Sequence, residues 1–177
     1  MNNMSLGDIL LGLLKTTLLL IFLEIFTSAV LPAIGIDNFK PEFNVLIILF
    51  LAFKLETPGV SYIILIIQFI HSIFSIEGWA IGTFVGVLIY LGIGYVKDML
   101  NFTTAISTII VVQIFQVIWF LISAFLITIK LGDMSSFFGV FWQYIPESLL
   151  LSILSPFFFQ LLDRFWAQKN RMSGVGI

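Results

Sequence analysis

The sequence predicts an all-α protein with six transmembrane helices, forming a single integral membrane domain over residues 1–177. Three observations predict it. Sixty per cent of the residues are hydrophobic and 10% are charged, whereas roughly a quarter of the residues of a soluble domain are charged. The apolar residues form segments long enough for helices, separated by Pro, Gly and charged residues. No connection between the segments is long enough to fold alone.

The first predicted span, 9–31, ends before Pro32. A cleaved signal peptide is the alternative, because a lysine, an apolar run and a TSA sequence resemble one. However, Glu24 interrupts the apolar run, and Asp8 lies where a signal peptide carries positive charge. We therefore expect an uncleaved first span.

The second predicted span, 41–57, decides how often the chain crosses the membrane. Pro41 suits the first turn of a helix, and Pro58 ends one. A helix of about 16 residues spans ~24 Å, which is short for a hydrocarbon core of ~30 Å, although Lys40 and Lys54 can reach the two interfaces. A re-entrant hairpin is the alternative. We expect a span, because a backbone turning within lipid leaves polar groups unsatisfied and the apolar run contains no Gly or Pro.

The remaining predicted spans are 60–74, 79–96, 103–129 and 146–166. In the last of them, Pro146 starts the helix and places Glu147 in the first turn, where a carboxylate interacts favourably with the helix dipole. Pro156 should kink this helix. Trp166 and the basic residues that follow predict either an anchor at the inner leaflet or an ordinary end of a span.

The distribution of cations places the C-terminus in the cytoplasm. With six spans, six cations share one side: Lys15, Lys54, Lys97, Arg164, Lys169 and Arg171. Lys40 and Lys130 lie on the other side. With five spans Lys40 and Lys15 exchange sides, so the count is again six against two. The positive-inside rule therefore orients the chain without deciding between five and six spans; six spans place both termini in the cytoplasm.

Gly78, Gly82 and Gly86 repeat every four residues and share one helix face. Small residues let another backbone approach closely, which is how membrane helices associate. This face is either a docking site for the transmembrane helix of a partner or a packing contact within the bundle.

Polar residues follow one face of 60–74, including Gln68 and His71, and one face of 103–129, including Gln113 and Gln116. Polar residues within a membrane face the bundle interior or a cavity. They predict either a small polar pocket or hydrogen bonds between helices, worth about 1 kcal/mol each. His71 is the only histidine and cysteine is absent, so no metal site is predicted.

Glu24 is the most informative single residue, because a carboxylate within a membrane span is by default a candidate functional group. It could bind a proton or a cation, or pair with a cation of a partner protein. Alternatively it is neutral and hydrogen-bonded to Gln113 or Gln116 within the bundle.

No catalytic residue and no cofactor is predicted. The chain has no Ser/His/Asp set, carboxylate pair, glycine-rich phosphate loop or metal-ligand spacing. A net charge of −2 is too small to predict nucleic acid or another charged partner. The sequence therefore predicts a membrane protein that is not an enzyme.

The segments together resemble the family of the rod shape-determining protein MreD. The stretch FKPEFNVLIILFLAF, residues 39–53, is similar to that family's aromatic, basic, Pro and polar residues before an apolar second span. The likeness extends to a short third span, a Gly-rich fourth span after EGWAIG at 77–82, and a last span with Pro and a basic end. The family often has an Asp and Gly pair near the end of span three, where this chain has Gln68 and His71, so it resembles a divergent member.

This resemblance implies a six-helix fold similar to the substrate-binding S-component of energy-coupling vitamin transporters. It also implies a non-enzymatic scaffold in the bacterial inner membrane, within the complex that elongates peptidoglycan and sets cell shape. The implied partners are MreC, through its membrane helix, and then MreB, RodA and a penicillin-binding transpeptidase; contact is expected at 77–86.

Two other functions stay open. A substrate-binding component of a vitamin-type transporter would need several convergent polar groups in an outer pocket. An ion- or proton-conducting subunit would be centred on Glu24.

Overall fold

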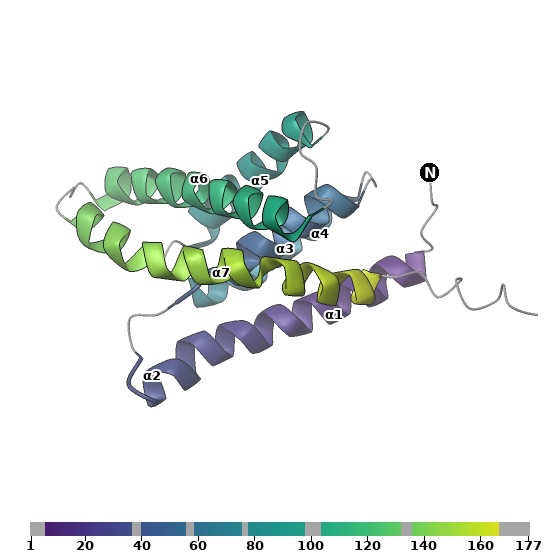
Figure 1. The fold of residues 1–177 in the computed structure, drawn as a ribbon, viewed down its shortest axis with the longest axis horizontal. Coiled ribbons are helices and arrows are strands. Elements are labelled where there is room, and N and C mark those ends of the chain that lie inside the picture. Colours follow the sequence, from purple (N-terminus) through teal and green to yellow (C-terminus); the bar gives the residue numbers. More distant parts are fainter. Residues whose placement is uncertain are drawn as a thin grey trace, which may run out of the picture.

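The structure is a computed structural model that describes residues 6–36, 40–55, 59–75, 78–97, 104–131 and 136–166; for 131, 136–140 and 143 it describes only the backbone. Within these ranges the chain is helical and has no strand, which confirms an all-α polytopic membrane protein. The elements are α1 (Leu6–Ile25), the π-helical turn η1 (Phe26–Val30), α2 (Leu31–Ala33), α3 (Phe43–Lys54), α4 (Val60–Phe74), α5 (Gly78–Val96), α6 (Ala105–Leu131) and α7 (Ser136–Trp166) (Figure 1).

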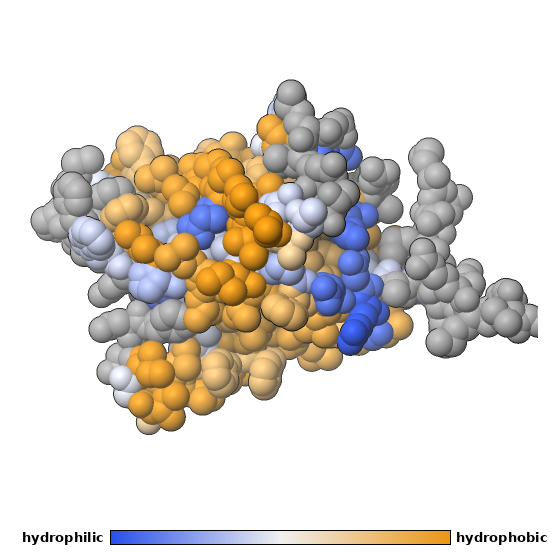
Figure 2. All heavy atoms as spheres, viewed as in Figure 1, coloured by the Kyte–Doolittle hydropathy of each residue, from blue (hydrophilic) through white to orange (hydrophobic). Residues whose placement is uncertain are grey.

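The protein is built to be embedded in a membrane. Among the described residues, 4 helical segments are long and apolar enough to cross a bilayer: Leu6–Ala33, Gly78–Val96, Ala105–Lys130 and Tyr144–Trp166. α3 and α4 are also apolar but shorter. Apolar side chains cover most of the face seen in Figure 2, and hydrophilic ones gather towards its right-hand end. Such a surface is stable only in contact with lipid or with apolar protein.

The first helical segment passes through Pro32 and ends at Ala33, two residues beyond its predicted end. In η1 the Leu31 N–H bonds to the Phe26 carbonyl, five residues earlier. Pro32, which has no N–H, follows directly. The wider π turn thus comes just before Pro32, which cannot donate a backbone hydrogen bond within the helix.

α3 is the central helix of the bundle. It contacts α1, α4, α5, α6 and α7, and every side chain from Val45 to Leu51 is at most 1% exposed. A helix that is apolar on all sides is stable only when it is surrounded. α3 begins at Phe43, after Pro41, and its 12 residues span about 18 Å. It is shorter than the predicted span 41–57, and protein rather than lipid covers it.

α3 runs from one end of the bundle to the other instead of turning back. At its start, the Lys40 N–H donates to Glu147 Oε1 at 2.7 Å, and Lys40 Nζ donates to the carbonyl of Phe74, the last residue of α4. At its end, Lys54 Nζ lies 3.1 Å from Asp163 Oδ1. We call these two sides of the bundle the Lys40 end and the Lys54 end. α3 and α7 therefore run parallel, which argues against a re-entrant hairpin.

The beginning of α1 and the end of α7 lie together at the Lys54 end, at the right of Figure 1. Trp166 Nε1 donates to Thr16 Oγ1 at 2.9 Å, and the indole ring packs against Gly12. Trp166 is 7% exposed, so its ring packs within the bundle, and of the two alternatives the ordinary end of a span fits better than the interfacial anchor. The described chain starts and finishes at one end of the bundle, as an even number of passes requires.

α7 is longer than predicted. It begins at Ser136 and continues through both Pro146 and Pro156. Glu147 is therefore not in a first turn, and the helix-dipole explanation for it is wrong; its carboxylate instead accepts the backbone N–H of Lys40. Pro156 cannot bond to the Ser152 carbonyl, but the Ser155 hydroxyl does, at 2.7 Å. A serine thus satisfies the acceptor that the proline leaves open.

Candidate functional site

A buried acid–base pair joins α1 to α4. His71 Nδ1 and Glu24 Oε1 are 2.6 Å apart, and each residue is 3% exposed. Glu24 lies just before η1, and the Thr27 hydroxyl in that turn donates to the Glu24 carbonyl. π-helical turns occur often at functional sites. The two ionisable groups lie in the half of the bundle nearer the Lys40 end.

Gln68 lies one turn before His71 on the same face of α4. Its side chain is 0% exposed, and neither of its amide atoms has a hydrogen-bond partner among the described residues. The second nitrogen of His71, Nε2, also has no partner there. Buried polar groups are normally paired. This cluster of Glu24, Gln68 and His71 therefore has unused hydrogen-bonding capacity beside an ionisable pair.

The predicted glycine face packs inside the chain. Gly82 and Gly86 are buried, and a Cβ at Gly86 would lie 2.9 Å from Gln68 Cγ. Gly78 begins α5 with φ of 76°, a conformation that favours glycine. At Gly86, α4 of this chain fills the space that a partner helix would need. The sequence left two alternatives for this face, a docking site for a partner helix or a packing contact within the bundle. The placement of Gly82 and Gly86 agrees with the packing contact.

A second polar cluster joins α6 to α7. Gln113 Nε2 donates to Ser148 Oγ at 3.2 Å, and Ser152 Oγ donates to Gln113 Oε1 at 2.8 Å. The Tyr144 hydroxyl donates to the backbone carbonyl of Gln116. The Gln116 side chain is 1% exposed and has no partner among the described residues.

The predicted polar residues therefore divide between two helix pairs. Glu24 bonds to His71 and not to Gln113 or Gln116, so that alternative is wrong. The position of each residue along its helix is a signal that could have paired Glu24 with His71. Both residues lie in the half of their helix nearer the Lys40 end.

An apolar groove runs between α5 and α6. Its volume is about 360 Å³. It is lined by Leu88, Ile89, Gly92 and Val96 of α5 and by Val111, Ile114, Phe115, Ile118 and Ile122 of α6. A Cβ placed on Gly92 would have no atom within 4 Å. Spacing along the sequence does not single out Gly92, because it lies outside the four-residue repeat of Gly78, Gly82 and Gly86.

No group of three His, Asp or Glu residues in the described chain could hold a metal ion. Glu77, Lys169 and Arg171 lie outside the described residues. No protein-family model, curated protein or solved structure matches this chain.

Proposed function

We propose that the protein is a non-enzymatic scaffold subunit of the bacterial complex that elongates peptidoglycan and maintains cell shape. Its task is to dock the transmembrane helix of an MreC-like protein, and through it to join MreB, RodA and a penicillin-binding transpeptidase in one hetero-oligomer. The resemblance of 39–53 to MreD supports this role. The observation that carries it is the open groove between α5 and α6.

The groove has the dimensions of a helix contact. It extends from Leu88 to Val96 on α5 and from Val111 to Ile122 on α6, which is between two and about three turns. The hydrophobic effect does not drive helix association within lipid, so contact depends on close packing, and small residues permit it. Gly92 lies in the groove with open space beside it. A partner helix can therefore approach the α5 backbone there.

Replacing Gly92 with Leu is expected to abolish co-purification of the MreC-like partner in mild detergent. A Cβ at this position would have no atom within 4 Å, so we expect the leucine side chain to enter the groove and fill the docking space while the fold stays intact. Gly94→Leu is the matched control: it lies two residues further along α5, is equally open, and does not line the groove.

Retention of the partner by Gly92→Leu at the level of the unmodified chain would contradict the proposal. Recovery of an ATPase module in place of an MreC-like protein would favour the transporter component. Gly82→Leu is a poor test, because Gly82 is buried within the bundle.

We place the protein in the cytoplasmic membrane with the Lys54 end inside. Lys54, Lys97 and Arg164 lie at helix ends on that side, and Lys15 lies in the half of the first helical segment nearer to it, whereas Lys40 and Lys130 lie at the other side. The positive-inside rule favours this orientation.

Tags at the two chain ends are expected to be accessible from the cytoplasmic face alone. Protease protection in right-side-out and inverted vesicles measures on which face each tag is accessible. Two tags on opposite faces would show an odd number of crossings and would exclude six spans.

A second candidate is an ion- or proton-conducting subunit, which the buried Glu24–His71 pair favours. In that case Glu24→Gln abolishes proton or cation flux in proteoliposomes. A scaffold, by contrast, keeps its partner in the same variant, because glutamine occupies the same volume and can still bond to the imidazole.

A further inference from the structure

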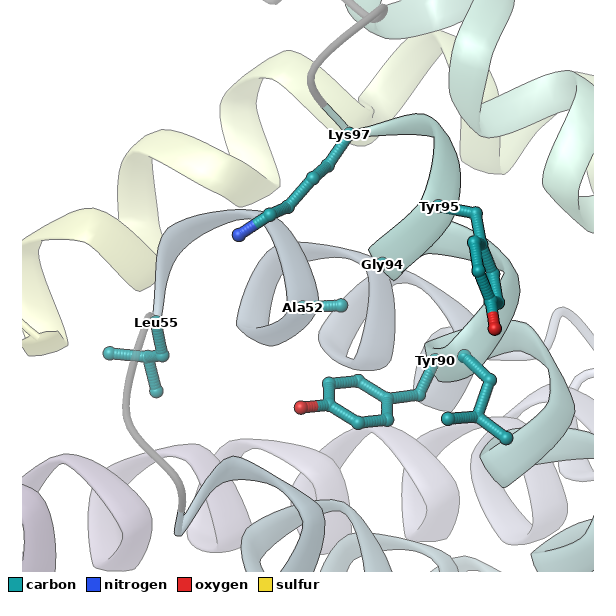
Figure 3. Close-up of a pocket in the computed structure, with 7 residues that line it drawn as sticks. Ala52, Leu55, Tyr90, Gly94, Tyr95 and Lys97 are labelled. Atoms are coloured by element: carbon teal, nitrogen blue, oxygen red, sulfur yellow. The ribbon is translucent and has the colours of Figure 1, made fainter.

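A second cavity lies at the Lys54 end, between the last turns of α3 and α5 (Figure 3). Its volume is about 590 Å³, and its lining includes Ala52 and Leu55 of the α3 end and Tyr90, Gly94 and Lys97 of the α5 end. This volume is within the range of small-molecule sites, ~300–1,000 Å³. Nothing in the proposed scaffold function uses this cavity.

The lining combines a cation with hydroxyl and apolar groups. In Figure 3 the Lys97 side chain extends from the end of α5 towards the last turn of α3, and Tyr90 points into the same space. An ammonium has three donor positions, so Lys97 can bind an oxygen of a ligand while keeping another partner. Tyr90 can donate a further hydrogen bond, and Leu55 and Ala52 offer apolar contact. These groups suit a phosphate attached to an apolar body.

The open edge of the cavity at Lys97 is where α5 is expected to meet the lipid head groups. Lys97 directly follows α5, an apolar helix long enough to cross a bilayer, and tyrosines and lysines collect where such helices meet the interface. Basic pockets between transmembrane helices on the cytoplasmic side are typical sites of lipid head groups. A membrane phospholipid is therefore the phosphate compound best placed to enter.

The charge of the site distinguishes between kinds of phospholipid. Two helices, α3 and α5, end at this cavity, and the C-terminal end of a helix carries partial negative charge, equivalent to roughly half an elementary charge. Lys97 supplies one positive charge. A head group with both a phosphate and a primary ammonium matches this pattern, whereas an anionic head group meets the negative helix ends without a cation of its own.

We propose that this cavity binds the head group of a zwitterionic ethanolamine phospholipid. Lys97 and Tyr90 hold the phosphate, and the ammonium N–H groups of the ligand face the C-terminal ends of α3 and α5. The acyl chains leave along the apolar surface of the bundle. The site is independent of partner docking, because it shares no lining residue with the groove between α5 and α6.

Gly94 allows a sharp test. A Cβ at this position would have no atom within 4 Å, and Gly94 lines the cavity, so we expect Gly94→Leu to fill part of the cavity while the protein still folds. Lys97→Gln removes the charge and keeps most of the side-chain length. Gly92→Leu is the matched control, on the same helix but facing the other groove.

The experiment is native mass spectrometry of the delipidated full-length protein titrated with palmitoyl-oleoyl phosphatidylethanolamine. Phosphatidylglycerol and phosphatidylcholine of the same chains serve as competing lipids. We expect retained phosphatidylethanolamine to fall about tenfold or more in Lys97→Gln, the effect of losing one hydrogen bond to a charged group. It should also fall in Gly94→Leu, because the leucine side chain occupies the space of the head group. It should not change in Gly92→Leu.

Phosphatidylcholine, whose quaternary ammonium has no N–H, should bind more weakly than phosphatidylethanolamine. If all variants retain as much phosphatidylethanolamine as the unmodified protein, the retained lipid is bound non-specifically to the apolar surface, and the proposal is overturned. Stronger binding of phosphatidylglycerol, or equal binding of phosphatidylcholine, would overturn the zwitterionic assignment.

Discussion

Replacing Glu24 with Leu is expected to lower the free energy of unfolding by about 3 kcal/mol, the lower end of the cost of removing one partner of a buried pair. Both Glu24 and His71 are 3% exposed, and their atoms are 2.6 Å apart. The variant leaves the imidazole buried with neither nitrogen paired, since Nε2 already has no partner among the described residues. Thermal or denaturant unfolding in detergent micelles measures the loss.

His71→Leu is expected to destabilise the protein by a similar amount, for the reciprocal reason. The double variant Glu24→Leu with His71→Leu should be closer to the unmodified protein than either single variant. Replacing both partners of a buried pair with apolar groups is often nearly neutral. The double-mutant cycle isolates this coupling. If the effects of the two single variants simply add, the pair contributes no interaction energy and the contact is incidental.

Glu24→Gln separates structure from ionisation at the same site. The amide keeps the volume of the carboxylate and can bond to His71 Nδ1, so we expect most of the stability to remain. If Glu24→Gln folds but loses all function, the function depends on the carboxylate itself, as expected of a proton or cation site.

Replacing Trp166 with Ala is expected to destabilise the protein by about 3–5 kcal/mol, the range for truncating a buried tryptophan. The indole is 7% exposed, packs against Gly12 and donates a hydrogen bond to Thr16 Oγ1 at 2.9 Å. Truncation opens a cavity between α1 and α7 and leaves the Thr16 oxygen with only its own bond to the Gly12 carbonyl. The unfolding midpoint in detergent is the measurement.

The opposite side of the same contact gives an independent check. A Cβ at Gly12 would lie 2.8 Å from two indole carbons, so Gly12→Ala must displace the ring and should destabilise the protein by about 1–3 kcal/mol. Gly92→Ala, in a helix with open space at that position, should instead stabilise by up to ~1 kcal/mol through helix propensity. If both alanine variants are stabilising, the α1–α7 contact is not as tight as the structure places it.

The helix boundaries differ most from the predicted ones beside prolines. Pro41 and Pro146 were expected in first turns, but α3 starts after Pro41 and α7 starts ten residues before Pro146. A proline within a membrane helix is tolerated when a side chain or a wider turn satisfies the backbone. Ser155 and η1 meet that need beside Pro156 and Pro32, and neither compensation shows in a pattern of apolar residues.

The candidate site was predictable in its residue types but not in its pairings. Polar residues within the predicted spans were expected to face the bundle interior, a cavity or a partner, because polar side chains in a membrane span face away from lipid. These residues are Glu24, Gln68, His71, Gln113 and Gln116. Helix periodicity identifies the face of one helix. It does not indicate which face of another helix lies opposite, and so the alternative that bonded Glu24 to Gln113 or Gln116 chose the wrong helix.

By itself the sequence determined that this chain is an all-α membrane protein, since 60% hydrophobic residues and 10% charged ones cannot cover a soluble surface. Only the tertiary structure decided that the apolar run of α3 is the centre of the bundle rather than a lipid-facing span. It also decided that Gly86 accommodates Gln68, while Gly92 and Gly94 stay open. The physical reason is common to all three: lipid and protein interior are equally apolar to a side chain, so hydrophobicity places a residue out of water without choosing its neighbour.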